Sequence, residues 1–289
     1  MSHAPLIIKV GGGEGIDITP VCHDVAELVS AGRPVVLIHG GSHETNIVAE
    51  KLGCPPKWIT SQSGRTSRRT DRETMEIFQM VYCGKANKSV VEQLQKLGVN
   101  AVGLSGMDGR VWQGERKGAI RAVENGRVRV IRDDLSGTVK TINADLLRSM
   151  LDAGLTPVLC PPAISTEGDP INVDADRAAA ATAGALRAEA LVLLSNVPGL
   201  LADVNDAGSL IHSVAPAELP TVLERHAQGR MKNKVQGAGE ALDAGVGTVV
   251  IASANVDRPV FTALEGHGTV FAYDHSTGVS PVRTAGEAQ

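Results

Sequence analysis

Short apolar runs alternate with longer amphipathic stretches along most of the 289 residues, and this alternation restricts the fold more than any other feature. The runs PLIIKV (5–10) and PVVLIHGG (34–41) are typical of buried strands that end in glycine turns. The stretch between them has a helical pattern, with Thr19 as an N-cap and Gly32 at its end. Repeated strand–helix alternation predicts an α/β fold with a largely parallel central sheet.

Glycine-rich turns follow the expected strands. In an open parallel sheet, ligands bind beyond the carboxyl ends of the strands, so these turns are the first candidates for a binding site. Their sequences are KVGGGEG (9–15), IHGGSHE (38–44), LSGMDG (104–109) and LLSNVPG (193–199). A hairpin is expected as well, because Asn125 and Gly126 separate two alternating runs.

Composition narrows the class of protein. The chain has 28 Lys and Arg residues against 32 Asp and Glu, a formal net charge of -4, which argues against a general nucleic-acid binder. Its four cysteines are widely spaced, which predicts reduced thiols rather than a zinc site or a disulfide framework. The sequence shows no signal-peptide pattern and no apolar run long enough to span a bilayer, so we expect a cytoplasmic protein.

The segment SGRTSRRTDRE, residues 63–73, is rich in arginine although the chain as a whole is acidic. Local clustering of this kind indicates an anionic partner. The alternative is a solvated loop, in which Arg69 and Arg72 pair with Asp71 and Glu73. The arginines of the cluster are Arg65, Arg68, Arg69 and Arg72.

Two glycine turns have the chemistry of an anion site. Lys9 stands near the end of a buried strand, just before three glycines that let backbone N–H groups approach a ligand. The alternative is a plain strand-to-helix turn with a lysine that reaches solvent. Gly40 and Gly41 repeat the arrangement at the start of the next helix. His39 and His43 flank them, but no third metal ligand is evident.

Charged residues also stand at the starts of two later helices. In INVDADRAA, Asp174 can cap the helix, whereas Asp176 lies inside it and is better suited to orienting a cation. The segment GRMKNKV places cations at a helix start, where the helix dipole disfavours them unless an anion is bound. One interpretation is therefore an anion site, and the alternative is a solvated basic turn. These cations are Arg230, Lys232 and Lys234. Lysines, glycine turns and an aspartate together are the parts that phosphoryl transfer requires.

An ordered set of motifs covers nearly the whole chain: KVGGGE, HGGS, RRTDRET, GKANK, INVDADRAA, LLSNVPGLL and RMKNKV. The set resembles the amino acid kinase family, in its acetylglutamate-kinase branch. The resemblance implies a three-layer α/β sandwich, the carbamate-kinase-like fold, whose mainly parallel central sheet has about eight strands. It also implies a substrate lobe over about 1–170 and an ATP lobe over about 171–275. The small, polar residues of 276–289 predict a frayed tail.

The resemblance assigns roles by motif. Lys9 and Lys234 would stabilise the transferring phosphoryl group, and Asp176 would orient both lysines. ATP would be the donor, with Mg²⁺ bound through the nucleotide and no metal bound by side chains. Arg68 would bind the free carboxylate of the substrate. The remaining implied residues are Gly40, Gly41 and Asn172 for the substrate, Gly11 and Gly12 for phosphate, and Ser195 and Asn196 for the nucleotide.

Two further expectations follow from the same resemblance. Family members commonly have Asp where this chain has Asn196, so the role of this residue departs from the family pattern. A homodimer is implied, with the helical stretch 71–97 either at its interface or inside the core.

The arginine cluster narrows the substrate. It resembles the subfamily that phosphorylates 2-aminoadipate joined to a small acidic amino-group carrier protein, in lysine biosynthesis. Arg65, Arg69 and Arg72 would then contact the carrier. The alternatives are an N-acetylglutamate kinase of arginine biosynthesis, a kinase that also accepts carrier-bound glutamate, and a non-catalytic effector-binding relative.

Overall fold

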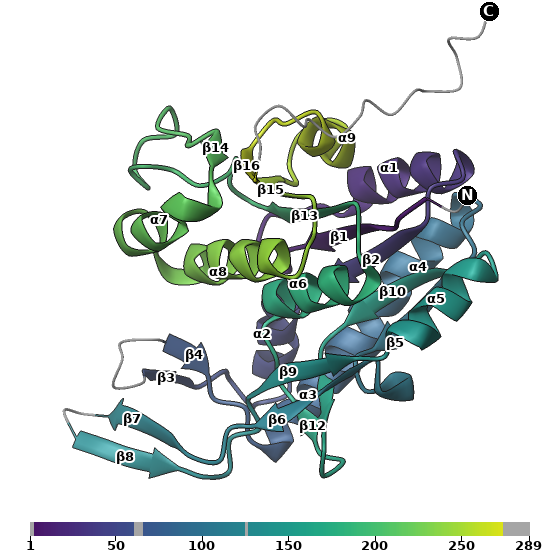
Figure 1. The fold of residues 1–289 in the computed structure, drawn as a ribbon. Helices are drawn as coiled ribbons and strands as arrows, with labels where there is room; N and C mark the ends of the chain where they lie inside the picture. The colour runs from purple at the N-terminus through teal and green to yellow at the C-terminus, as the bar shows by residue number, and fades with distance from the viewer. Residues whose placement is uncertain (1–2, 61–65, 125–126, 274–289) are drawn as a thin grey trace, which may run out of the picture.

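An eight-stranded sheet forms the centre of the molecule, in agreement with the sequence prediction (Figure 1). The computed structural model describes residues 3–60, 66–124 and 127–273. In sheet order the strands are β14 (Ser213–Val214), β16 (Thr269–Ala272), β15 (Thr248–Ser253), β13 (Ala190–Ser195), β1 (Leu6–Val10), β2 (Val35–His39), β10 (Thr156–Cys160) and β5 (Ala101–Ser105). Neighbouring strands from β15 to β5 are parallel, whereas β16 runs antiparallel to β15.

Helices cover both faces of this sheet and complete the predicted three-layer sandwich (Figure 1). One face carries α1 (Thr19–Ser30), α4 (Asn87–Lys96) and α9 (Pro259–Leu264), and the other carries α5 (Ala144–Asp152), α6 (Ala175–Leu186) and α8 (Gly229–Asp243). The central strands are therefore buried on both faces, which explains their nearly continuous apolar sequences.

Strand β1 divides its side chains between the two cores. Leu6, Ile8 and Val10 pack with α1, α4 and α9, whereas Ile7 packs on the side of α6 and α8. Side chains alternate along a strand, so Lys9 shares the face of Ile7. The strand thus directs its one charged side chain toward α6 and α8, at the carboxyl end of the sheet.

The helical stretch predicted over 71–97 is continuous. It consists of α3 (Arg72–Gln79), the π-helical segment η1 (Met80–Ala86), and α4. In the part of the chain that is described, no helix is long and apolar enough to cross a membrane.

Side-chain caps begin some of the helices. Asp71 caps α3, where its carboxylate accepts the Thr74 N–H at 3.0 Å, and Asp174 caps α6 as predicted. The prediction for Thr19 was wrong, because this residue is the first of α1 and not its cap. Its N–H donates to Asp17 Oδ1 at 2.9 Å, two residues earlier in the chain.

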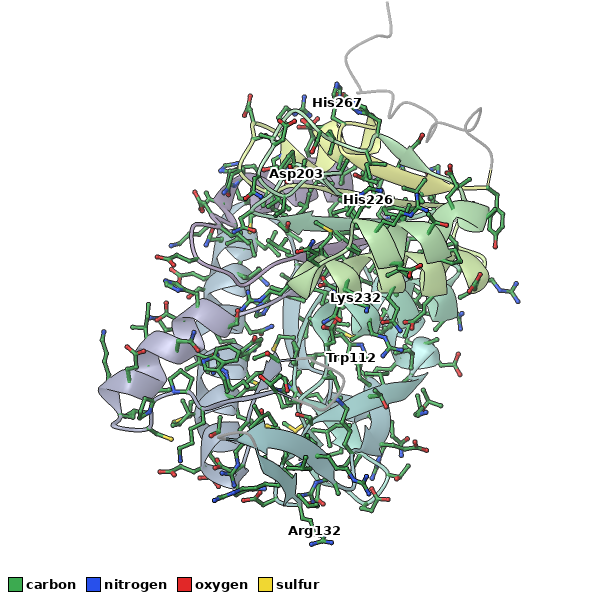
Figure 2. All side chains as sticks on the ribbon, turned by 90° about the vertical axis from the view of Figure 1, so that its left-hand side faces the viewer. Trp112, Arg132, Asp203, His226, Lys232 and His267 are labelled. Atoms are coloured by element: carbon green, nitrogen blue, oxygen red, sulfur yellow. The ribbon has the colours of Figure 1, made fainter. Side chains whose placement is uncertain are left out.

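Smaller elements extend from the body of the molecule beyond the carboxyl ends of the strands. They are a sheet of β12 (Pro170–Ile171), β11 (Ala163–Ser165), β6 (Trp112–Arg116) and β9 (Gly137–Ile142), the hairpins β3–β4 (Trp58–Thr60, Thr66–Arg68) and β7–β8 (Ile120–Glu124, Arg127–Ile131), and the helices α2 (Ser42–Lys51) and α7 (Leu219–Arg225). The antiparallel pairing of β7 with β8 confirms the predicted hairpin strands, while its turn at Asn125 and Gly126 lies outside the described residues. Buried Trp112 joins the small sheet to α6, since its indole N–H donates to Thr182 Oγ1 at 3.0 Å (Figure 2).

Candidate active site

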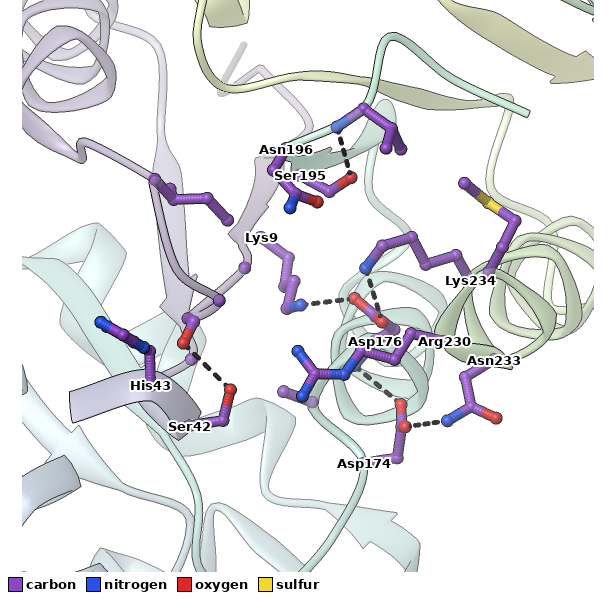
Figure 3. Close-up of a pocket in the computed structure, with 18 of the residues that line it drawn as sticks. Lys9, Ser42, His43, Asp174, Asp176, Ser195, Asn196, Arg230, Asn233 and Lys234 are labelled. Carbon is purple, nitrogen blue, oxygen red and sulfur yellow. Dashed lines mark hydrogen bonds and ion pairs between the residues drawn. The ribbon is translucent and has the colours of Figure 1, made fainter. Parts of the chain in front are cut away.

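A cleft of about 700 Å³ opens at the carboxyl ends of β1 and β13 (Figure 3). Such a volume suits a small-molecule or cofactor site. The cleft is lined by the glycine turns after β1 and β2, by the starts of α6 and α8, and by the β3–β4 hairpin. The predicted site residues that line it are Lys9, Gly11, Gly12, Gly40, Arg68, Asn172, Asp176, Ser195, Asn196 and Lys234.

Two lysines converge on one buried carboxylate in this cleft. Lys9 Nζ lies 2.6 Å from Asp176 Oδ1, and Lys234 Nζ donates to Asp176 Oδ2 at 2.8 Å (Figure 3). Each of the three side chains is at most 9% exposed. The group as a whole carries an excess of one positive charge in a place with little water, where a charge acts strongly on a ligand.

The protonation of this group follows from its geometry. Burial alone would raise the pKa of the Asp176 carboxyl, but the two ammonium groups outweigh burial and hold this pKa well below its usual range. Burial lowers the pKa of the Lys234 ammonium, and the charge of Lys9 adds to that effect, although Asp176 opposes it. Asp176 is therefore ionised and contacts both lysines.

The cap of α6 places Asp176 and Lys234 together. Asp174 Oδ1 accepts the N–H groups of Asp176 at 3.0 Å and Arg177 at 3.1 Å, which fixes the first turn of the helix. Asn233 of α8 donates its side-chain amide to Asp174 Oδ2. Because Asn233 directly precedes Lys234, this contact ties the second lysine to the helix that carries its carboxylate. The sequence did not predict this role for Asn233, because no motif or capping pattern around the residue indicates its contact with Asp174.

The two glycine turns touch through their backbones. A Cβ atom on Gly12 would lie 2.0 Å from Gly41 N, and one on Gly40 would lie 2.5 Å from Gly12 N, so neither position has room for a side chain. Gly11 N–H donates to Leu194 O and Gly40 N–H donates to Val10 O, each at 2.9 Å. Gly11 and Gly40 thus use their donors to join strands. Gly12 N–H has no acceptor among the described residues and can face an anion.

Tyr82 of η1 lines the cleft beside the second glycine turn. A Cβ atom on Gly41 would lie 3.3 Å from the Tyr82 ring, and that ring stacks on Phe78 at a centroid distance of 3.9 Å. Burial raises the pKa of the Tyr82 hydroxyl to about 12, against the opposing effects of Arg68 and the Gly41 N–H. Tyr82 is thus a neutral wall of the cleft. Gly41 itself is not among the lining residues.

Arg68 has the geometry of a carboxylate anchor. Its Nη2 donates to Ser42 O at 3.1 Å and to Asn46 Oδ1, and its guanidinium lies 5.9 Å from the centre of the Trp58 ring. Its Nη1 is buried and has no hydrogen-bond partner in the described part of the chain. Burial lowers the pKa of Arg68, and the charge of Arg230 lowers it further. An anion at Nη1 would relieve both effects.

Asn172 lies on the same side of the cleft, where its side-chain amide donates to Thr70 Oγ1 at 2.9 Å. On the opposite side, Ser195 Oγ accepts the Val197 N–H at 3.4 Å and Asn196 is exposed. Apolar lining residues adjoin this second region, as a nucleotide base would require. They are Val197, Leu200, Leu201, Val204 and Met231.

Arg69 and Arg72 do not line the cleft. Arg65 lies outside the described residues. Arg69 Nη2 pairs with Asp133 Oδ2 at 2.6 Å, and Arg72 Nε pairs with Glu76 Oε1 at 2.9 Å on the exposed surface of α3. The partners considered from the sequence, Asp71 and Glu73, are therefore not the ones observed.

Neither histidine beside the second glycine turn forms a metal site with its neighbours. His39 Nδ1 donates to Gly40 O at 2.8 Å, and its Nε2 accepts from Asn87 Nδ2 at 3.1 Å. Burial lowers the pKa of His39 to about 4, so the ring is neutral. Within residues 3–60, 66–124 and 127–273, no three His, Cys, Asp or Glu side chains are arranged to bind a metal ion. Asp174 and Asp176 are both engaged by protein donors.

The chain is similar to known proteins both in sequence and in fold. The model of the amino acid kinase family matches residues 5–253. The chain is 58% identical to the [LysW]-aminoadipate kinase of Deinococcus radiodurans, over 92% of this chain and 90% of that protein. It is 53% identical to the [LysW]-aminoadipate kinase of Thermus thermophilus, over 92% and 99%. Among solved structures, the fold matches N-acetylglutamate synthase from Neisseria gonorrhoeae with a TM-score of 0.73 and 24% identity, over 94% of this chain and 60% of that one.

Proposed function

The chain belongs to the amino acid kinase family, and on this premise we propose that it transfers the γ-phosphoryl group of ATP to the side-chain carboxylate of 2-aminoadipate linked to a LysW-like carrier protein. The product is an acyl phosphate, as lysine biosynthesis by this route requires. The observation that carries the proposal is the Lys9–Asp176–Lys234 group, which faces an arginine anchor across one cleft.

The chemistry needs charge and position rather than a base. The acceptor carboxylate is already ionised, so its oxygen can attack the γ-phosphorus directly while the bond to the β-phosphate oxygen breaks. Lys9 and Lys234 stabilise the negative charge of the transferring group and of the departing ADP. Asp176 keeps both ammonium groups in place. Mg²⁺ supplies further positive charge on the nucleotide phosphates when it is bound.

The two ends of the cleft serve the two substrates. Arg68, with its buried and unpartnered Nη1, binds the α-carboxylate of the aminoadipate, and Asn172 binds beside it. Ser195 and Asn196 face the nucleotide. Gly12 donates its N–H to a phosphate oxygen, in the manner of other glycine turns that bind anions.

The proposal also includes where the carrier docks, the oligomeric state and the location in the cell. The amine of the aminoadipate is joined to the carrier, so the carrier must dock at the mouth of the cleft. We expect Arg65, Arg69 and Arg72 to contact it. We also expect a homodimer formed through the stretch 71–97, and a cytoplasmic location.

The decisive test compares acceptors in one assay. The purified protein is given ATP, Mg²⁺ and one of three acceptors: carrier-bound aminoadipate, free N-acetylaminoadipate or free N-acetylglutamate. Hydroxylamine traps the acyl phosphate as a hydroxamate, and Lys234→Met serves as the inactive control. The highest kcat/KM is expected with carrier-bound aminoadipate. Faster turnover of N-acetylglutamate would instead identify an acetylglutamate kinase, and no hydroxamate with any acceptor would indicate a non-catalytic relative.

A further inference from the structure

Arg230 is a cation of the cleft that none of the roles above uses. It is the second residue of α8, directly after Gly229, whose φ of 51° is in the left-handed region. It lines the cleft and is exposed there, and it makes no hydrogen bond or ion pair with the described residues. Figure 3 shows its guanidinium between the lysine group and the turn at Ser42.

The side chain crosses from the nucleotide side to the glycine turn after β1. Its Nη1 lies 3.7 Å from the position that a Cβ atom on Gly13 would occupy. Its charge is also felt on the acceptor side, where it contributes to the lowered pKa of Arg68 after the larger effect of burial. Arg230 therefore stands between the phosphate turn and the carboxylate anchor, where a phosphoryl group must pass from donor to acceptor.

The surroundings favour an anion next to Arg230. Lys9 and Lys234 share a single carboxylate, so Arg230 adds a further positive charge to a cleft that is already cationic. It also stands in the first turn of α8, where the helix dipole disfavours a cation unless an anion is bound. Lys232 offers a comparison on the same turn. It is exposed and does not line the cleft, so proximity to the helix start alone does not place a cation in the site (Figure 2).

We propose that Arg230 is a catalytic residue that donates its guanidinium N–H groups to the non-bridging oxygens of the phosphoryl group during transfer. This inference rests on the proposed kinase function. In the step, the acceptor oxygen forms a bond to the γ-phosphorus, the bond from that phosphorus to the β-phosphate oxygen breaks, and ADP keeps the electron pair. Arg230 retains its protons throughout and stabilises charge together with the buried lysines. A planar guanidinium can contact two oxygens at once, which a lysine cannot.

The test combines turnover with binding of a transition-state analogue. Arg230→Met is compared with Lys232→Met, which removes the same charge from the same helix turn outside the cleft. Removing one preorganised donor to a transition state lowers kcat about 100-fold, and this is the loss expected for Arg230→Met. Lys232→Met should match the wild type. Affinity for ADP with aluminium fluoride and acceptor, measured by calorimetry, should fall by a similar factor in Arg230→Met, while affinity for ADP alone stays nearly unchanged.

Each other outcome has a defined meaning. If Arg230→Met keeps its kcat and raises only the KM of the carrier-bound acceptor, the arginine binds a substrate carboxylate and the proposal is wrong. Equal losses in Arg230→Met and Lys232→Met would show that any positive charge at the start of α8 has the same effect. That result would also overturn the proposal. Arg230→Lys should recover only part of the lost kcat. If the wild type forms no hydroxamate at all, the proposed function fails, and that result is separate from any difference between the variants.

Discussion

Lys9 and Lys234 share one carboxylate, so each residue of the group depends on the other two. Lys234→Met should raise the activation free energy by about 3 kcal/mol, the effect of losing one charge donor, and so lower kcat. The remaining Lys9–Asp176 pair should preserve the fold. Steady-state kinetics with carrier-bound aminoadipate measures this loss, and circular dichroism checks the fold. A near-normal kcat in a folded variant would contradict the role of Lys234.

The same group predicts a pH dependence. The folded-state pKa of Lys234 lies below the 10.5 of a free lysine, so this ammonium loses its proton earlier as the pH rises. Turnover should therefore decline on the alkaline side before 10.5 is reached. Lys234→Arg keeps its charge at every accessible pH, so its turnover should be lower but its alkaline limb should move upward. Profiles of kcat/KM against pH, which report the free enzyme, measure this limb, and coincident alkaline limbs would exclude Lys234 as the titrating group.

Asp176 should make the stability of the fold depend on pH on the acid side. Its folded-state pKa is held below the unfolded value, so its stabilisation is fully present above that value of 3.8 and is lost as the pH falls through the folded pKa. Asp176→Asn leaves two buried ammonium groups without an anion, and we expect a loss of about 3–5 kcal/mol at neutral pH. Urea unfolding should show this difference from the wild type shrinking below about pH 4. A difference that stays constant into acid would contradict the ion-paired carboxylate.

At the scale of elements, the contact between the two glycine turns is the one that tolerates an added side chain least. Gly12→Ala would drive a methyl group into the backbone of Gly41, so the turns must separate and the cleft must distort. We expect a clear fall in thermal stability and loss of activity. Gly84→Ala is the matched control, because a Cβ atom there meets nothing within 4 Å and its backbone is helical. That substitution should be neutral or stabilising by about 0.5–1 kcal/mol. Equal melting temperatures for Gly12→Ala and the wild type would disprove the close approach.

The arginine segment around β4 yields the prediction for the carrier. Arg65→Glu combined with Arg69→Glu should sharply raise the KM for carrier-bound aminoadipate and leave turnover of a small acylated analogue nearly intact. The wild-type reaction with carrier should also lose efficiency as salt rises, because exposed charges are screened over a Debye length of about 8 Å. Lys51→Glu, in the last turn of α2 and exposed, serves as the control for charge reversal. Equal losses on both acceptors would assign the segment to the pocket instead.

Over the whole molecule, the layers and the order of elements could be predicted because they depend on patterns within single segments. The apolar run of β1, the cap at Asp174 and the glycines after each strand are all local signals. They place Lys9 and Asp176 at strand and helix ends, where a parallel sheet gathers its ligands.

The contacts between distant segments could not be predicted in the same way. Asn46 holds Arg68 from α2, and Asn233 holds the cap of α6 from α8. Both are single polar residues on otherwise ordinary helices, and their partners depend on how two elements approach in three dimensions. Arg230 is similar, since its position beside Gly13 depends on how α8 packs against the sheet.

Strand β1 has a consequence for changes in chain length. Its side chains alternate between two cores, and Lys9 belongs to the face of α6 and α8. Inserting or deleting one residue between Lys9 and Gly11 would turn the ammonium into the apolar layer beneath α1 and send an aliphatic side chain toward Asp176. A change of two residues would restore the face but displace the ammonium along the strand by about 6–7 Å, beyond reach of the carboxylate. We therefore expect relatives that keep the activity to exchange one aliphatic residue for another in this strand, and to keep the spacing between the lysine and the glycines.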